Sequence, residues 1–289
     1  MMLPLLKSDL YRLLRSTYFW VVTVLSVVFC GGFTLIGTTL APGGDEPTPG
    51  AGHVWRTHAA MLSDALLAGG MLCLFVVLMA VHLASEDTER GFVKNLFAGR
   101  SRRTVYYVEK LTLLAGITVW LTLLNIAVME MMFAALGYRY AVPEPWGGTV
   151  LYVALMMLGM FAMGAVVAAL TWLIRSKAFA MTAGVLVAIG IVHSALALLA
   201  AMLVSSMKAN WIGVLPQMTI TSALQQLGGQ PENLFFALGL GPTGVLPDLS
   251  GTAPTWGWPL WVFSLVIFAL WIAVAAAVTL LANRRRDVC

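Results

Sequence analysis

Charged residues are scarce in this chain: they make up 10% of its 289 residues, whereas soluble domains carry about 25%. So few charges cannot cover the surface of a water-soluble fold of this length. Apolar residues make up 60% of the chain, and its mean hydropathy is +0.88. A soluble globular domain is therefore excluded, and lipid has to form part of the protein's surroundings.

Cysteine is also scarce, and Cys30, Cys73 and Cys289 are widely separated. Their spacing fits neither a zinc site nor a disulfide framework. No two histidines share a helical face, which disfavours a metal site. The sequence also lacks the G-x-x-x-x-G-K-[ST] phosphate loop, so we expect this chain to bind no ATP or other cofactor itself.

Six apolar stretches are long enough to cross a membrane, which takes about 20 apolar residues in a helix. The predicted spans cover residues 18–40, 60–85, 111–136, 149–174, 178–204 and 258–282. Residues 1–16 form an amphipathic pattern, typical of an elbow helix in the membrane interface or of an ordinary positively flanked start. We predict an all-α integral membrane protein with one transmembrane domain over residues 1–289.

Positive charge predicts the orientation of these spans. With the N-terminus inside, all but three of the 17 Lys and Arg residues fall on the cytoplasmic side. The exceptions are Arg56, Arg139 and Lys208. Because cytoplasmic loops of membrane proteins carry the excess of Lys and Arg, both termini are predicted to be cytoplasmic.

The segment 205–257 is predicted to be a long extracellular loop that contains short helices. It is rich in Gly and Pro but keeps much apolar content, notably in VLPQMTITSALQQLGG (214–229) and PENLFFALGLG (231–241). Each piece is too short to span a membrane, so we expect re-entrant or outer helices before the last span.

Charge is concentrated between the second and third spans. Residues 85–110 hold ten charges in 26 residues, with a short apolar edge at Phe92, Leu96 and Phe97. A tether between two helices needs only a few residues. The pattern favours a surface helix that docks on another protein, and a solvated positive loop is the alternative.

This segment resembles the cytoplasmic loop of type-two ABC exporter permeases, especially the branch with bacitracin exporters and lantibiotic-immunity permeases. The matching positions are Glu86, Glu89, Gly91, Val93, Lys94, Asn95, Gly99, Ser101, Arg102, Tyr106, Tyr107 and Lys110. The order of elbow, six spans and long outer loop before the last span is similar as well.

The resemblance implies a permease subunit of an exporter in the bacterial plasma membrane, with residues 86–110 as the coupling segment. Two permease copies, identical or different, would sit on two ATP-binding subunits that hold ATP and Mg, with no nucleic acid involved. A hydrophobic or amphipathic substrate such as a peptide antibiotic would be exported, which gives resistance or immunity. The implied coupling residues are Glu86, Glu89, Arg90, Gly91, Phe92, Lys94, Asn95, Leu96, Arg100 and Arg102.

Ionisable and amide side chains within spans are candidates for a substrate path, because they are costly at membrane depth. Asp64 and Glu130 both fall toward the outer ends of their spans and are candidates for a shared cation-attracting vestibule. The alternatives are a helix cap for Asp64 and an interhelical contact for Glu130. Asn125 and His193 are similar candidates, for which an interhelical hydrogen bond is the simpler interpretation.

Small residues recur every four positions in two of the spans. Ala180, Gly184 and Ala188 mark the fifth span, and Ala269, Ala273 and Ala277 mark the sixth. Such stripes allow close helix contacts, within one subunit or between two.

Two other functions compete with the permease. A non-ATP-driven channel or secondary transporter fits the hydropathy, although no charged ring or internal repeat is visible. An intramembrane enzyme is disfavoured, because the acidic pair Glu86-Asp87 lies at a span edge and Arg90 is wrongly spaced for a Glu-Glu-x-x-x-Arg motif.

Overall fold

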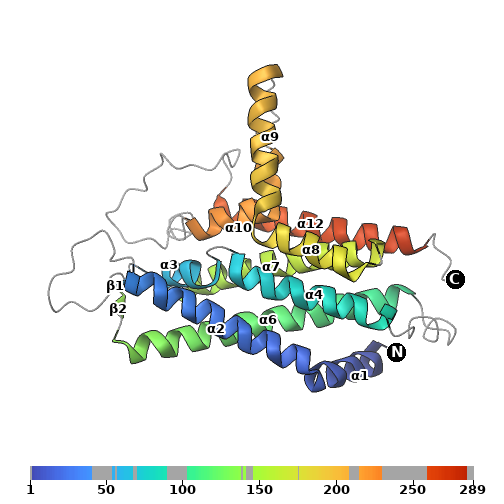
Figure 1. Ribbon diagram of the computed structural model, residues 1–289, viewed down its shortest axis with the longest axis horizontal. Coiled ribbons are helices and arrows are strands. Elements are labelled where there is room, and N and C mark those ends of the chain that lie inside the picture. The colour runs from blue at the N-terminus through green and yellow to red at the C-terminus, as the bar shows by residue number, and fades with distance from the viewer. Residues whose placement is uncertain are drawn as a thin grey trace.

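The protein is described from a computed structural model, in which nearly all described residues are helical. The described residues are 2–40, 54–55, 57–67, 70–89, 103–137, 139–140, 146–174, 176–207, 215–229 and 259–284. Most of the helices run along one common direction, and α9 stands away from the others (Figure 1).

Among the described residues, four helices are long and apolar enough to cross a membrane. They are α2 (Thr17–Leu40), α6 (Arg103–Ala135), α7 (Trp146–Ile174) and α12 (Leu260–Arg284). Proline, which would break such a helix, is absent from all four. The prediction of an all-α membrane protein is confirmed at this level. The third span begins at Arg103 rather than at residue 111, so the end of the predicted coupling segment is helical.

The second predicted span, 60–85, is a bent pair of helices rather than one helix. It consists of α3 (His58–Leu62), the π-helical turn η1 (Ser63–Leu67) and α4 (Met71–Glu89), with a bend of 51° at the break. Gly70 has φ +70°, a conformation that L side chains rarely adopt, and a Cβ atom there would collide with the Ala188 carbonyl. A bend at this point lets the chain pass close to Ala188.

The fifth predicted span, 178–204, is bent as well. The α8 helix (Lys177–Ala188) and the α9 helix (Ile191–Met207) meet at 64°, and Gly190 at the corner has φ +82°. Twelve helical residues reach only about 18 Å, so α8 alone is too short to span the hydrocarbon core of about 30 Å. One straight helix over 178–204 is therefore not what the chain forms.

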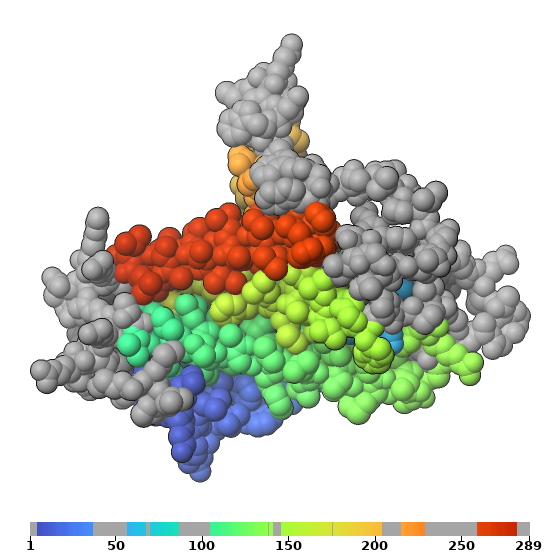
Figure 2. All heavy atoms as spheres, turned by 180° about the vertical axis from the view of Figure 1, so that it is seen from behind, coloured from blue at the N-terminus to red at the C-terminus, as the bar shows by residue number. Residues whose placement is uncertain are grey.

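The α7 helix lies at the centre of the bundle. It contacts α4 and α8 on one side and α12 and α10 (Ile220–Gly229) on the other. A Cβ atom at Gly159 would come within 2.5 Å of Leu224 on α10 and 2.7 Å of Phe268 on α12, so glycine permits this packing. Figure 2 shows the opposite face, on which α12, α7, α6 and the helices α1 and α2 follow one another from top to bottom.

The predicted short helix in 214–229 is present as α10, and it packs into the bundle against α7, α12 and η1. The other predicted piece, 231–241, lies outside the described residues, as does the rest of the segment up to residue 258.

The two ends of the bundle differ in what they contain. At one end lie α1 (Met2–Arg15), the end of α4, the start of α6 and the end of α12 (Figure 1). At the other end lie α3 and a short parallel pair, β1 (Val54–Trp55) with β2 (Arg139–Tyr140). Met2–Arg15 thus form a helix separate from α2, and the chain turns at Ser16 into α2.

Candidate functional site

The predicted coupling segment is described only at its two flanks. Glu86 and Glu89 lie in the last turn of α4. The other predicted coupling residues lie outside the described residues, and they are Arg90, Gly91, Phe92, Lys94, Asn95, Leu96, Arg100 and Arg102. The structure therefore describes what anchors the segment at each side.

At the α4 side, His82 anchors the end of the helix to α2. The His82 ring stacks on Tyr18 with centroids 4.2 Å apart, and its Nε2 lies 3.9 Å from Glu86 Oε2. The Tyr18 hydroxyl also donates a hydrogen bond to the Leu78 carbonyl at 3.4 Å. The last turns of α4 are thus held against the start of α2.

At the α6 side, a buried ion pair joins α6 to α1. Lys110 Nζ lies 2.6 Å from Asp9 Oδ2, and the Lys110 side chain is only 4% exposed. Arg12 also approaches Asp9, at 3.6 Å. A charge this deeply buried needs a partner, and Asp9 supplies it. The sequence shows Asp9 only as one polar residue of an amphipathic helix, so this pairing was not predicted.

Aromatic contacts hold the same start of α6 against α7. Tyr107 packs edge-to-face on Trp172 with centroids 5.0 Å apart, and Tyr106 packs in the same way on Tyr107. Both tyrosines are buried. The first turns of α6, which form the end of the charged segment, are therefore fixed to both α1 and α7.

Asn125 makes the interhelical hydrogen bond that was its simpler interpretation. Its Nδ2 donates to Ser26 Oγ on α2 at 3.0 Å and to the Leu121 carbonyl at 2.8 Å. Asn125 is fully buried between α2 and α6.

Glu130 belongs to a polar cluster at the end of the bundle that carries the β pair. His58 Nδ1 lies 2.9 Å from Glu130 Oε1, and the Tyr140 hydroxyl donates to Glu130 Oε2 at 3.1 Å. The His58 and Tyr140 rings stack with centroids 3.6 Å apart. The cluster connects α3, α6 and β2, which agrees with an interhelical role for Glu130. Neither His58 nor Tyr140 was a candidate from the sequence.

Asp64 does not cap a helix. The N-cap of α3 is Thr57, whose side chain accepts a hydrogen bond from the Ala60 backbone N–H at 3.1 Å. Asp64 lies beyond α3 in the π-helical turn η1. Within the described ranges its carboxylate has no ion pair or hydrogen bond.

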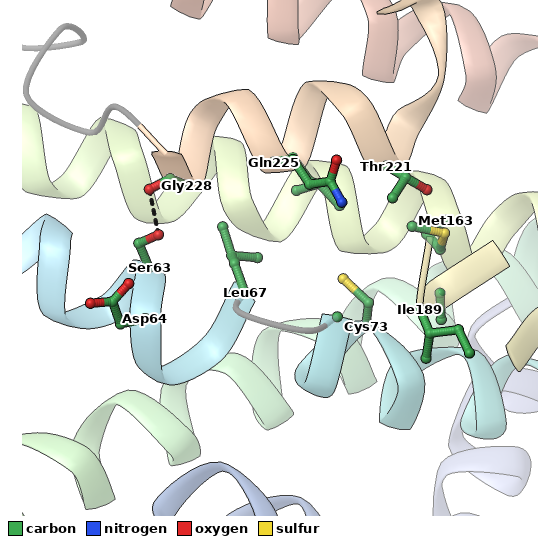
Figure 3. Close-up of a pocket in the computed structure, with 12 residues that line it drawn as sticks. Ser63, Asp64, Leu67, Cys73, Met163, Ile189, Thr221, Gln225 and Gly228 are labelled. Carbon is green, nitrogen blue, oxygen red and sulfur yellow. Dashed lines mark hydrogen bonds between the residues drawn. The ribbon is translucent and has the colours of Figure 1, made fainter. Parts of the chain in front are cut away.

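A pocket of about 240 Å³ opens beside Asp64, between the two bends of the chain (Figure 3). Its walls come from η1, α4, α7, the α8–α9 corner and α10. The lining residues are Ser63, Asp64, Leu67, Gly70, Cys73, Met163, Ala188, Ile189, Thr221, Leu224, Gln225 and Gly228. Glu130 is not among them, so this pocket does not bring Asp64 and Glu130 together.

Two hydrogen bonds hold α10 over the bends that form the pocket. Ser63 Oγ donates to the Gly228 carbonyl at 2.5 Å, and Thr221 Oγ1 donates to the Val187 carbonyl at 3.2 Å. Figure 3 shows the Ser63–Gly228 bond at the Asp64 end of the pocket. Thus α10 closes one side of the pocket by contacting both broken helices.

His193 lies in the first turn of α9 and is bonded to the segment before α10. Its Nδ1 is 3.0 Å from Thr219 Oγ1, and Thr219 in turn donates to the Pro216 carbonyl. His193 does not line the pocket. Its contact is the interhelical kind expected of an isolated histidine.

The two small-residue stripes have different surroundings. Ala180, Gly184 and Ala188 are buried within the chain, and a Cβ atom at Gly184 would come within 2.6 Å of Val77 on α4. The stripe of Ala269, Ala273 and Ala277 on α12 is exposed. Close packing inside one subunit therefore explains the first stripe.

The fold is that of an all-α membrane protein, and a mainly apolar pocket lined in part by Asp64 lies between its two broken helices. No group of three or more His, Cys, Asp or Glu side chains that would hold a metal ion occurs in the described part of the chain. No family model and no curated protein sequence matches this chain.

Proposed function

We propose that this chain is the transmembrane permease subunit of an ATP-driven exporter. The observation that carries the proposal is the charge-rich segment from the end of α4 to the start of α6, which holds ten charges in residues 85–110 of an otherwise apolar chain. Its flanks, Glu89 and Arg103, lie at the same end of the bundle as α1 and the end of α12 (Figure 1). A segment of this kind suits docking on an ATP-binding subunit.

The proposal counts each bent pair as one span, which makes six. Apart from Arg139, the described Lys and Arg residues lie on α1, near the starts of α6 and α8 or at the end of α12: Lys7, Arg12, Arg15, Arg103, Lys110, Lys177 and Arg284. These helix ends gather at the end of the bundle that carries α1 (Figure 1). The positive-inside rule then puts this end in the cytoplasm, with α1 as an elbow helix in the interface. The membrane is the bacterial plasma membrane, and a second permease copy completes the transporter.

In this mechanism, ATP and Mg are held by the partner subunits. Movement of the coupling segment reaches α4 and α6 directly, because both helices leave from it. The Asp9–Lys110 ion pair and the Tyr107–Trp172 contact fix the start of α6 to α1 and α7, so these three helices move together. The result is alternating access for a hydrophobic or amphipathic substrate such as a peptide antibiotic.

Co-purification tests the proposal. The chain is expressed with the ATP-binding protein encoded beside its gene, and the recovered ATP-binding protein is quantified. Phe92→Asp is expected to lower this recovery at least tenfold, because it places a charge on the apolar edge that docks. Leu136→Asp is the matched control, since Leu136 is exposed at the opposite end and should leave recovery unchanged. Equal recovery with Phe92→Asp would overturn the coupling assignment.

One observation favours a second candidate, a secondary transporter. Two interrupted helices meet at a pocket whose carboxylate has no ion pair among the described residues, and interrupted helices are where such transporters place substrate and ions. Vesicles that contain this chain alone separate the two candidates. Efflux of ethidium driven by a proton gradient, without ATP or an ATP-binding subunit, would support the secondary transporter. Efflux only with the partner and ATP would support the exporter.

A further inference from the structure

We propose that the pocket between η1, α4, α8 and α10 binds the ammonium group of a small amphipathic amine, with Asp64 as its counter-ion. The inference deepens the proposed function, because it names the part of a transported substrate that this chain recognises. It concerns a group about the size of one basic side chain and not an entire peptide.

The size of the pocket sets the size of the ligand. A dry cavity of about 150 Å³ lined by Leu, Ile and Phe holds one benzene ring. The pocket here measures about 240 Å³. It therefore has room for a ring or short chain together with a polar head group, and is too small for a folded or cyclic peptide.

The hydrogen-bonding groups of the pocket favour a ligand that donates. The hydroxyl protons of Ser63 and Thr221 are already donated to backbone carbonyls, which leaves both hydroxyl oxygens as acceptors. The Asp64 carboxylate adds two more acceptor oxygens. Among the described lining residues, Gln225 has the one side chain with strong N–H donors. An ammonium group, with three donors and no acceptor, matches this surplus of acceptors.

The charge of the pocket favours a cation. Asp64 lines the pocket with an exposed side chain, and it has no ion pair with any residue in the described ranges. The carboxylate therefore has no counter-charge among the described residues, and a cation bound in the pocket would supply one. A metal ion would need further ligands, and the described residues hold no group of three suitable side chains.

The remaining walls suit the apolar part of an amine. Leu67, Met163, Leu224 and Ile189 line the pocket away from the carboxylate. Figure 3 shows Asp64 at one end, next to the Ser63–Gly228 bond, and Cys73 and Met163 further along. An amine would thus place its head group at Asp64 and its tail toward Met163.

The α4 helix places this pocket near the outer face if the charged end of the bundle is cytoplasmic. From Met71 to Glu89, α4 rises about 28 Å, close to the full thickness of the hydrocarbon core. Its first turn, and with it the pocket, then lies near the outer boundary. An amine would enter from the outer leaflet or leave toward it.

The test uses the purified full-length chain in lipid nanodiscs, without any ATP-binding subunit. The probe is 2-phenylethylamine, and 2-phenylethanol is its neutral counterpart. Binding is followed by the rise in unfolding temperature with ligand concentration, since a ligand that binds only the folded state stabilises it. The amine is expected to give a saturable rise at concentrations at least tenfold lower than the alcohol.

Three variants locate the binding. Asp64→Asn should weaken amine binding at least tenfold, and Cys73→Phe should weaken amine and alcohol alike by filling the pocket. Glu130→Gln is the matched control, because Glu130 is a carboxylate near the same end that is bonded to His58 and Tyr140 and lies outside the pocket. It should bind the amine as the unmodified chain does.

Equal binding of amine and alcohol to the unmodified chain would overturn the inference without any variant. An unchanged affinity in Asp64→Asn, or an equal loss in Glu130→Gln, would overturn it as well. Because no ATP-binding subunit is present, these outcomes are independent of the permease assignment. If the chain binds the amine but recovers no ATP-binding subunit in the co-purification, the amine site would be supported and the exporter proposal would be rejected.

Discussion

Polar side chains inside the bundle are used in two ways. Asn125 and His193 form contacts between neighbouring helices, whereas Asp64 lines a pocket and has no partner among the described residues. The sequence predicts all of them as candidates, because each is a polar group in an apolar run. It does not predict which helix each one faces, since partners such as Ser26 and Thr219 lie 99 and 26 residues away.

The sequence also does not predict the partners of Glu130. Hydropathy marks it as an unusual charge within a span, but its partners His58 and Tyr140 lie in segments without helical periodicity. Only the return of both loops to the same end of the bundle brings the three residues together. A vestibule shared with Asp64 was a reasonable hypothesis from two antiparallel helices, and the described pocket contains Asp64 alone.

Gly184 tests how closely the helices pack. Gly184→Ala should lower the free energy of unfolding by about 1–3 kcal/mol, because the new Cβ atom would lie 2.6 Å from Val77 and 2.9 Å from Val167. Gly116→Ala is the control: a Cβ atom there meets nothing within 4 Å, so alanine should stabilise the helix by up to about 1 kcal/mol. Denaturant unfolding in detergent measures both. Equal effects of the two substitutions would contradict the α4–α7–α8 packing.

At the scale of elements, apolar runs predicted where helices lie and missed where they bend. The spans at 18–40, 149–174 and 258–282 match α2, α7 and α12 within a few residues at their starts and ends. The bends at Gly70 and Gly190 fall inside apolar runs of full membrane length, which hydropathy treats as continuous. What fixes them is tertiary: Gly70 lies against Ala188, and α10 is hydrogen-bonded to both bent segments.

The contact between α1 and α6 can be tested by its ion pair. Asp9→Asn should lower the free energy of unfolding by about 3 kcal/mol, because it leaves the buried Lys110 ammonium without its nearest carboxylate. Asp9→Asn combined with Lys110→Met should recover much of that loss, since no uncompensated charge remains. Lys7→Gln, an exposed residue on the same helix, should change stability by less than about 0.5 kcal/mol. Additive effects of Asp9→Asn and Lys110→Met would show that the pair does not form.

At the scale of the whole molecule, composition alone was enough for the class of protein. A chain with 10% charged residues and several runs of membrane length has to be embedded in lipid, and the helical bundle agrees. Composition does not predict the pocket. It forms where two bent helices and α10 meet, and the first bend lies more than 100 residues before the second bend and α10 in the chain. Its existence depends on how the bends are placed in space.

The central claim is that the chain crosses the membrane with its basic end in the cytoplasm, where an ATP-binding subunit docks. The most direct measurement is sidedness of labelling by a membrane-impermeant maleimide, on a background in which the native cysteines are replaced. Leu136→Cys places an exposed thiol directly after the end of α6, and Ser176→Cys places one between α7 and α8, at the opposite end of the bundle. The account predicts that Leu136→Cys is labelled in intact cells and that Ser176→Cys is labelled only in inverted vesicles. Labelling of both positions from the same side, or the reverse pattern, would contradict it.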